Sequence, residues 1–234
     1  MNEIKKALTF SYDDGVTQDK RLIAIFNKYG LKGTFNLNSG LLGKSGELVR
    51  NGVRVDHTRI APEEVRAVYE GHETAVHTVT HPKLTDEDEN GIISQVENDR
   101  EALSLLAGYE VKGMAYPAGY QSERVIETVK NKTKVKYARG IKVTYGFAPS
   151  GDMFEYCGTL YHHQDWDRLF EIGEIFLKTE VGTPQIMYIW GHSYEFDIYP
   201  ERWKKFEEFC EMMSGRRDIF YGTNIRVFEK FSLI

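Results

Sequence analysis

The stretch ALTFSYDDGVTQDKRLIAIFNKYGLKGTFNL, residues 7–37, decides the fold class. Residues 7–10 are apolar enough to form a buried strand. Apolar side chains then recur at the three- and four-residue intervals of one helical face: Leu22, Ile25, Phe26 and Tyr29. Gly30 is typical of a helix end, and GTFNL at 33–37 predicts the next strand. A strand, a helix and a second strand in this order predict two parallel strands joined by a right-handed crossover.

The same alternation continues along the chain. Further strands are predicted at 73–76, 113–116 and 185–190, and further helices at 63–71, 96–106, 169–177 and 203–213. Asn51-Gly52 interrupts the alternation and predicts a hairpin insertion around 41–59 with a type I′ turn. Because there is no internal repeat or linker, we expect one α/β domain over 1–234 with a parallel sheet, either open or closed into a barrel.

Composition excludes several classes of partner. The chain has 234 residues, 41% of them hydrophobic and 28% charged, with a net charge of −5. This acidic balance gives no basic surface for nucleic acid, and no apolar run approaches the ~20 residues of a membrane span. Cys157 and Cys210 lie outside any zinc or redox motif, and no secretory segment is visible at the start. We therefore expect a cytoplasmic protein; its oligomeric state stays undetermined.

Polar side chains follow several predicted strands at the point where each strand ends: Asp13-Asp14, His77 with His81, Tyr116-Pro117, and His192. In parallel α/β folds the carboxyl ends of the strands meet at one edge, and ligands bind there. Four such coincidences predict a single site at that edge.

The residue types at this edge suggest a metal. Adjacent carboxylates such as Asp13-Asp14 repel each other unless a cation lies nearby, although a helix-capping turn is the alternative. His77 and His81 can bind one divalent ion, or they can be ordinary loop histidines. A His-His-Asp set with an open position is typical of hydrolytic metal sites, and without sulfur ligands zinc, or else cobalt or nickel, is expected. His192 is either a general acid or a core histidine.

Taken in order, these motifs resemble the polysaccharide deacetylase family (carbohydrate esterase family four). The motifs are LTFSYDDG at 8–15, GHE at 71–73 leading to HTVTHP at 77–82, AYPAG at 115–119 and WGH at 190–192. The resemblance implies a distorted (β/α) barrel with parallel strands. It also implies a divalent metal and the hydrolysis of N-acetyl groups, sometimes O-acetyl groups, on saccharides.

Carried over residue by residue, Asp14, His77 and His81 match the metal ligands of the family. Asp13 matches the catalytic base and His192 the catalytic acid. Ala118 is expected to offer its backbone N–H to the oxyanion. The remaining residues expected to bind substrate are Tyr116, Pro117, His162, His163 and Trp190.

The sequence departs from the family pattern at two places. The arginine that braces the base aspartate is replaced by Ala115, and we expect Arg139, after the next predicted strand, to substitute for it; a surface arginine is the alternative. The fourth motif is not clearly visible around 161–166. The expected activity is removal of N-acetyl groups from an amino sugar or short saccharide. The alternatives are an O-acetyl esterase, a non-sugar amidase with the same site, and a non-catalytic sugar-binding domain.

Overall fold

A computed structural model describes residues 4–234 and contains a central, wholly parallel sheet. Its strands are β1 (Lys6–Asp13), β2 (Gly33–Leu37), β5 (Glu73–Val76), β6 (Gly113–Ala115), β7 (Tyr137–Val143), β8 (Tyr156–Gly158), β9 (Leu160–Tyr161), β10 (Gln185–Gly191) and β11 (Ile219–Tyr221). Their order is β8-β7-β6-β5-β2-β1-β10-β9, and β11 pairs with the first half of β1. The strands predicted from apolar runs all lie in this sheet.

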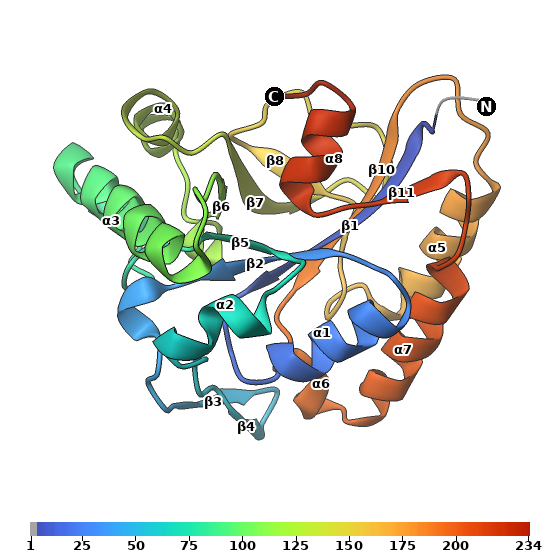
Figure 1. The fold of residues 1–234 in the computed structure, drawn as a ribbon, viewed down its shortest axis with the longest axis horizontal. Coiled ribbons are helices and arrows are strands. Elements are labelled where there is room, and N and C mark those ends of the chain that lie inside the picture. The colour runs from blue at the N-terminus through green and yellow to red at the C-terminus, as the bar shows by residue number, and fades with distance from the viewer. Residues whose placement is uncertain (1–3) are drawn as a thin grey trace.

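Helices surround the sheet (Figure 1). They are α1 (Asp19–Lys28), α2 (Val65–Val68), α3 (Glu89–Ala107), α4 (Glu123–Lys132), α5 (Leu169–Lys178), α6 (Glu195–Ile198), α7 (Glu201–Met213) and α8 (Asn224–Lys230). The helix predicted at 63–71 is shorter than expected, because a 3₁₀ turn at Pro62–Glu64 precedes α2. In residues 4–234 every helix is too short or too polar to cross a lipid bilayer.

The sheet closes on itself through the chain. Strands β8 and β9 stand at opposite ends of the strand order, yet only Thr159 separates them in the sequence. The Thr159 N–H donates a 2.7 Å hydrogen bond to the Tyr188 carbonyl oxygen on β10. The sheet must therefore curve until its two ends meet, which confirms the distorted barrel and the single α/β domain expected from the sequence.

The predicted hairpin insertion is present. Strands β3 (Glu47–Arg50) and β4 (Val53–Asp56) pair antiparallel, and the turn residues Asn51 and Gly52 have φ angles of 51° and 77°. Positive φ at both turn residues defines the type I′ geometry that the Asn-Gly pair favours. In Figure 1 the hairpin lies at the end of the molecule opposite α8.

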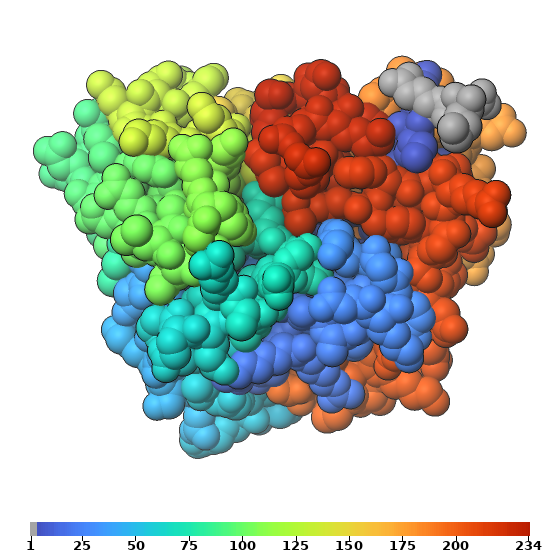
Figure 2. Space-filling view, viewed as in Figure 1, coloured from blue at the N-terminus to red at the C-terminus, as the bar shows by residue number. Residues whose placement is uncertain are grey.

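The C-terminal segment packs on the barrel. Val227 and Phe228 of α8 are fully buried, and the Phe228 ring lies 4.9 Å from that of Tyr137 and 4.7 Å from that of Tyr156. Figure 2 shows this red segment as part of a continuous surface beside the yellow-green α4. Helix α8 therefore covers the barrel at the end away from the hairpin.

Candidate active site

Four of the predicted site residues line one cavity of about 410 Å³. Asp14, His81, Ala118 and His192 line it from the carboxyl ends of β1, β5, β6 and β10. The hairpin insertion contributes the opposite wall through Leu48, Arg50, His57 and Arg59. The expectation that ligands bind at the carboxyl ends of parallel strands thus predicted the place of the cavity, and the insertion forms part of its wall.

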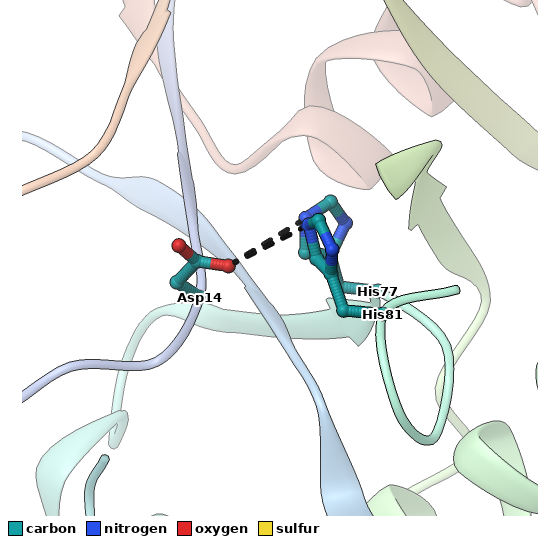
Figure 3. A group of neighbouring side chains, drawn as sticks. All are labelled: Asp14, His77 and His81. Carbon is teal, nitrogen blue, oxygen red and sulfur yellow. Dashed lines mark ion pairs between the residues drawn. The ribbon is translucent and has the colours of Figure 1, made fainter. Parts of the chain in front are cut away.

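Three side chains offer ligand atoms to one point (Figure 3). The Asp14 Oδ1 atom is buried without a hydrogen-bond partner among residues 4–234, and it lies 3.9 Å from Nε2 of His77 and 3.9 Å from Nε2 of His81. His77 Nδ1 lies 2.8 Å from the Ala115 carbonyl oxygen, which can only accept, so Nδ1 carries the proton. The Nε2 lone pair is therefore free for a metal. Burial lowers the pKa of His77 to about 4, which keeps it neutral.

The backbone that presents these ligands is strained. Asp14, Thr78 and His81 have φ angles of 85°, 69° and 57°, in the left-handed region that disfavours side-chain-bearing residues. Such strain is concentrated at functional sites and needs support from the surrounding structure. Asp99 on α3 gives part of that support, because its carboxylate accepts hydrogen bonds from the backbone N–H groups of His77 (3.0 Å) and Ser39 (2.6 Å).

Asp13 is held by two side chains. Arg139 Nη2 lies 2.5 Å from Oδ1 and 2.6 Å from Oδ2 of Asp13, and Asn36 Nδ2 donates to Oδ1 at 2.8 Å. Burial alone raises the pKa of Asp13, but Arg139, His77 and His192 together, Arg139 most strongly, hold the pKa below its usual value. The carboxylate is therefore charged and fixed in direction.

Arg139 lies on the strand next to the one where the family pattern has arginine. Arg139 lies within β7, not after a strand as predicted, and it is fully buried, so the surface alternative is wrong. Its register partner on β6 is Ala115, the position where the family pattern has arginine. The guanidinium carbon lies 4.6 Å from the centre of the Trp190 ring. Strand β7 thus places a positive charge beside the position on β6 where the family pattern has arginine.

His192 is paired with a residue that the sequence did not reveal, Glu195. His192 Nδ1 lies 3.1 Å from Glu195 Oε1, and the His192 backbone N–H donates to Oε2 at 3.0 Å. Its Nε2 lies 4.0 Å from Asp13 Oδ2, facing the centre of the site. Burial alone lowers the pKa of His192, but the carboxylates of Glu195, Asp14 and Asp13, Glu195 most strongly, together raise it to about 9. His192 is therefore protonated at neutral pH, as a general acid must be.

Several residues expected to bind substrate lie off the cavity wall. The Tyr116 hydroxyl donates to the Phe154 carbonyl oxygen (2.9 Å), and Pro117 is buried. Trp190 stacks on Tyr161 with ring centres 4.2 Å apart. His162 is buried and stacks on Phe196, whereas His163 is half-buried next to Tyr199. Of the predicted substrate residues only Ala118, whose φ is 48°, lines the cavity.

The sequence also missed residues that contact Asp13 and Asp14: Asn36, His57 and Arg59. Asp99, which supports the backbone of His77, was also missed, and it is the one residue whose role the sequence pattern could have indicated. It falls on the buried face of α3 with Ile92, Val96 and Leu103, and an acidic side chain there needs polar partners. The importance of His57 and Arg59 depends on how the hairpin packs, which spacing does not show.

Comparison with solved structures places this fold in a class. The chain resembles a family 4 carbohydrate esterase from Streptomyces lividans, solved in complex with acetate, with a TM-score of 0.57 and 18% identity over 93% of this chain and 91% of that one. It also resembles the Xyl-CE4 domain of a multidomain xylanase from the hindgut metagenome of Trinervitermes trinervoides, with a TM-score of 0.58 and 15% identity over 97% and 91% of the two chains. The fold is therefore that of family 4 carbohydrate esterases.

A family model described as polysaccharide deacetylase matches residues 1–138. The chain belongs to the polysaccharide deacetylase family. Among curated proteins none matches it. A CE4 family pseudoenzyme from Bacillus anthracis shares the fold, with a TM-score of 0.56 and 14% identity over 98% of this chain and 67% of that one. Because a pseudoenzyme has this fold, the fold alone does not establish activity, which depends on the site residues.

Proposed function

We propose that this protein is a divalent-metal-dependent hydrolase that removes N-acetyl groups from an amino sugar or a short saccharide. One observation carries the proposal. The buried Asp14 Oδ1, which accepts no hydrogen bond from residues 4–234, lies 3.9 Å from Nε2 of both His77 and His81. Membership of the polysaccharide deacetylase family supports the same reaction class.

Asp14, His77 and His81 would hold the metal and leave a position open for substrate. Nitrogen and carboxylate donors suit zinc, and cobalt or nickel would fit the same set. A divalent ion there supplies Lewis-acid polarisation of the acetyl carbonyl and lowers the pKa of water from 15.7 to about 7. The native metal and a cytoplasmic location stay predictions.

Asp13 is the general base in this proposal. As water attacks the acetyl carbon, its proton passes to the Asp13 carboxylate, which Arg139 and Asn36 hold in one orientation. The Arg139 brace also weakens the non-catalytic alternative, whose main support was the alanine at position 115. General bases of this kind contribute about 10²- to 10⁴-fold to rate.

His192 completes the reaction as the general acid. Its Nε2 proton passes to the amide nitrogen while the carbon–nitrogen bond breaks, which gives acetate and a free amine. Glu195 keeps this imidazole charged and oriented through its contact with Nδ1. An amide needs this proton more than an ester does, because the amine is the poorer leaving group.

The shape of the cavity supports a short substrate. Its volume of about 410 Å³ is within the roughly 300–1,000 Å³ range of small-molecule sites, and the hairpin residues Leu48 and Arg50 stand on one side of it. We expect N-acetylated mono- and disaccharides to be hydrolysed faster than oligomers of four or more sugars. A strong preference for the longer oligomers would contradict a short substrate while leaving the reaction type intact.

Acetate release from N-acetylglucosamine and its oligomers tests the proposal, with the protein stripped of metal and reloaded with zinc, cobalt or nickel. We expect metal-dependent release that disappears in Asp14→Ala and Asp13→Asn. Asp86→Asn, which alters an exposed carboxylate that does not line the cavity, is the matched control. Full metal loading with no acetate released from any of these sugars would refute the proposed activity.

A further inference from the structure

The hairpin insertion brings two side chains to Asp14 from the residues that follow β4. His57 Nε2 lies 3.0 Å from Asp14 Oδ2. Arg59 Nη1 donates to the Asp14 backbone oxygen at 2.7 Å and lies 3.4 Å from Oδ1. Arg59 is buried, and the His57 side chain is only 14% exposed. These contacts belong to the segment that interrupts the βα pattern, so they arise from the insertion rather than from the barrel.

Backbone hydrogen bonds join this segment to the loop that carries Asp14. Arg59 forms a bridge with Val16, the Ile60 N–H donates to the Gly15 oxygen (2.9 Å), and the Thr17 N–H donates to the Thr58 oxygen (2.9 Å). Asp14 itself has a φ of 85° and depends on its surroundings to keep that conformation. The insertion therefore constrains both the backbone and the side chain of the proposed metal ligand.

We propose that His57 and Arg59 are positioning residues for the metal centre, and that the hairpin insertion thereby sets metal affinity. His57 holds Asp14 Oδ2 so that Oδ1 alone faces His77 and His81, while Arg59 fixes the backbone of Asp14. This inference rests on the proposed metal site. It goes beyond that proposal by assigning a role to the insertion.

The hydrogen-bond chemistry defines the role of His57. An ionised carboxylate only accepts hydrogen bonds, so the 3.0 Å contact to Oδ2 places the proton on His57 Nε2. Arg59 Nη1, which lies 3.2 Å from the same Nε2, then donates to the Asp14 backbone oxygen instead. The ring packs edge-on against Tyr194, with centres 4.9 Å apart and planes at 87°, so its direction is fixed. Without this donor the carboxylate can rotate, and Oδ1 is no longer held toward the two imidazoles. Loss of such an outer partner typically lowers metal affinity by about 10- to 100-fold.

Zinc affinity, measured by competition with a chromophoric chelator on the full chain, tests the proposal without relying on activity. We expect the dissociation constant to rise about 10- to 100-fold in His57→Ala, and to return to within about threefold of the starting protein in His57→Gln, whose amide can donate to Oδ2. Arg54→Ala, on the same hairpin but paired only with Glu47 among residues 4–234, is the matched control and should bind zinc normally.

The Asp14→Ala variant separates the two proposals. If Asp14→Ala loses zinc and His57→Ala binds it as tightly as the starting protein, the metal site stands and the role of the insertion is refuted. If Asp14→Ala keeps full affinity, the proposed metal site itself is wrong. Thermal melting of each metal-free variant shows whether the fold is intact, and His57→Gln provides the decisive comparison if His57→Ala unfolds.

Discussion

Replacing Arg139 by methionine would leave the Asp13 carboxylate buried and without its cation. The two side chains are 1% and 5% exposed, and their charged atoms are 2.5 Å apart. At an effective dielectric constant of ~20, Coulomb's law gives an attraction of about 7 kcal/mol at that distance, before the cost of desolvation is subtracted. Removing one partner of a buried pair costs about 3–5 kcal/mol in measured cases. Because methionine preserves most of the packing, we expect Arg139→Met to lower the free energy of unfolding by about 3–5 kcal/mol.

Urea unfolding followed by circular dichroism, with chelator present so that no metal contributes, measures this cost. The double variant Asp13→Asn/Arg139→Met removes both charges, so it should be at least about 2 kcal/mol more stable than the sum of the single changes predicts. Additive effects within about 0.5 kcal/mol would refute a strong coupling between the two residues. Both single variants should also lose at least about 100-fold in deacetylation rate, if Asp13 is the base.

Two further predictions concern other parts of the molecule. Glu195 makes the largest contribution to raising the pKa of His192 to about 9 against the effect of burial, so in Glu195→Gln the acid loses its proton at a lower pH. The alkaline limb of the kcat/KM profile should move to lower pH, with activity at pH 8 falling more than at pH 6; an unchanged limb would exclude this pairing as the cause. Phe228→Ala should cost about 3–5 kcal/mol of unfolding free energy by creating a cavity under α8, yet leave zinc affinity unchanged, because α8 lies at the opposite end from the hairpin. A tenfold loss of zinc affinity in that variant would contradict this separation.

Local patterns in the sequence predicted a parallel α/β sheet because they reflect short-range physics, whereas the barrel was expected from the family resemblance. Apolar runs, helical spacing and the Asn51-Gly52 turn each act over a few residues, and they predicted the longer strands, the hairpin and helices α1, α2, α3, α5 and α7. Helices α4, α6 and α8 were not predicted. Strands β8, β9 and β11 were not predicted, since each has only two or three residues and leaves no periodic pattern. Their pairing depends on the strands beside them.

The site residues also divide into those that local patterns predicted and those whose place depends on the fold. Asp14, His77 and His81 were predicted because each follows a strand, and the carboxyl ends of parallel strands meet at one edge of the sheet. Arg139 was predicted, but its place within β7 and its register with Ala115 became visible only in the sheet. His57 and Glu195 were missed for different reasons. His57 reaches Asp14 from 43 residues away, and Glu195 lies in a one-turn helix whose start the sequence does not mark.

The position of β1 has a consequence for how the protein is made. β1 ends at Asp13, but its neighbour β10 begins at Gln185, and β11 and α8 come later still. At about 5–20 residues per second, a ribosome needs roughly ten to thirty seconds to synthesise the intervening chain. During that time one side of an apolar strand lacks its native partner, and such open edges promote aggregation. Newly made chains should therefore depend on chaperones until their last third emerges, and slower translation should increase that dependence.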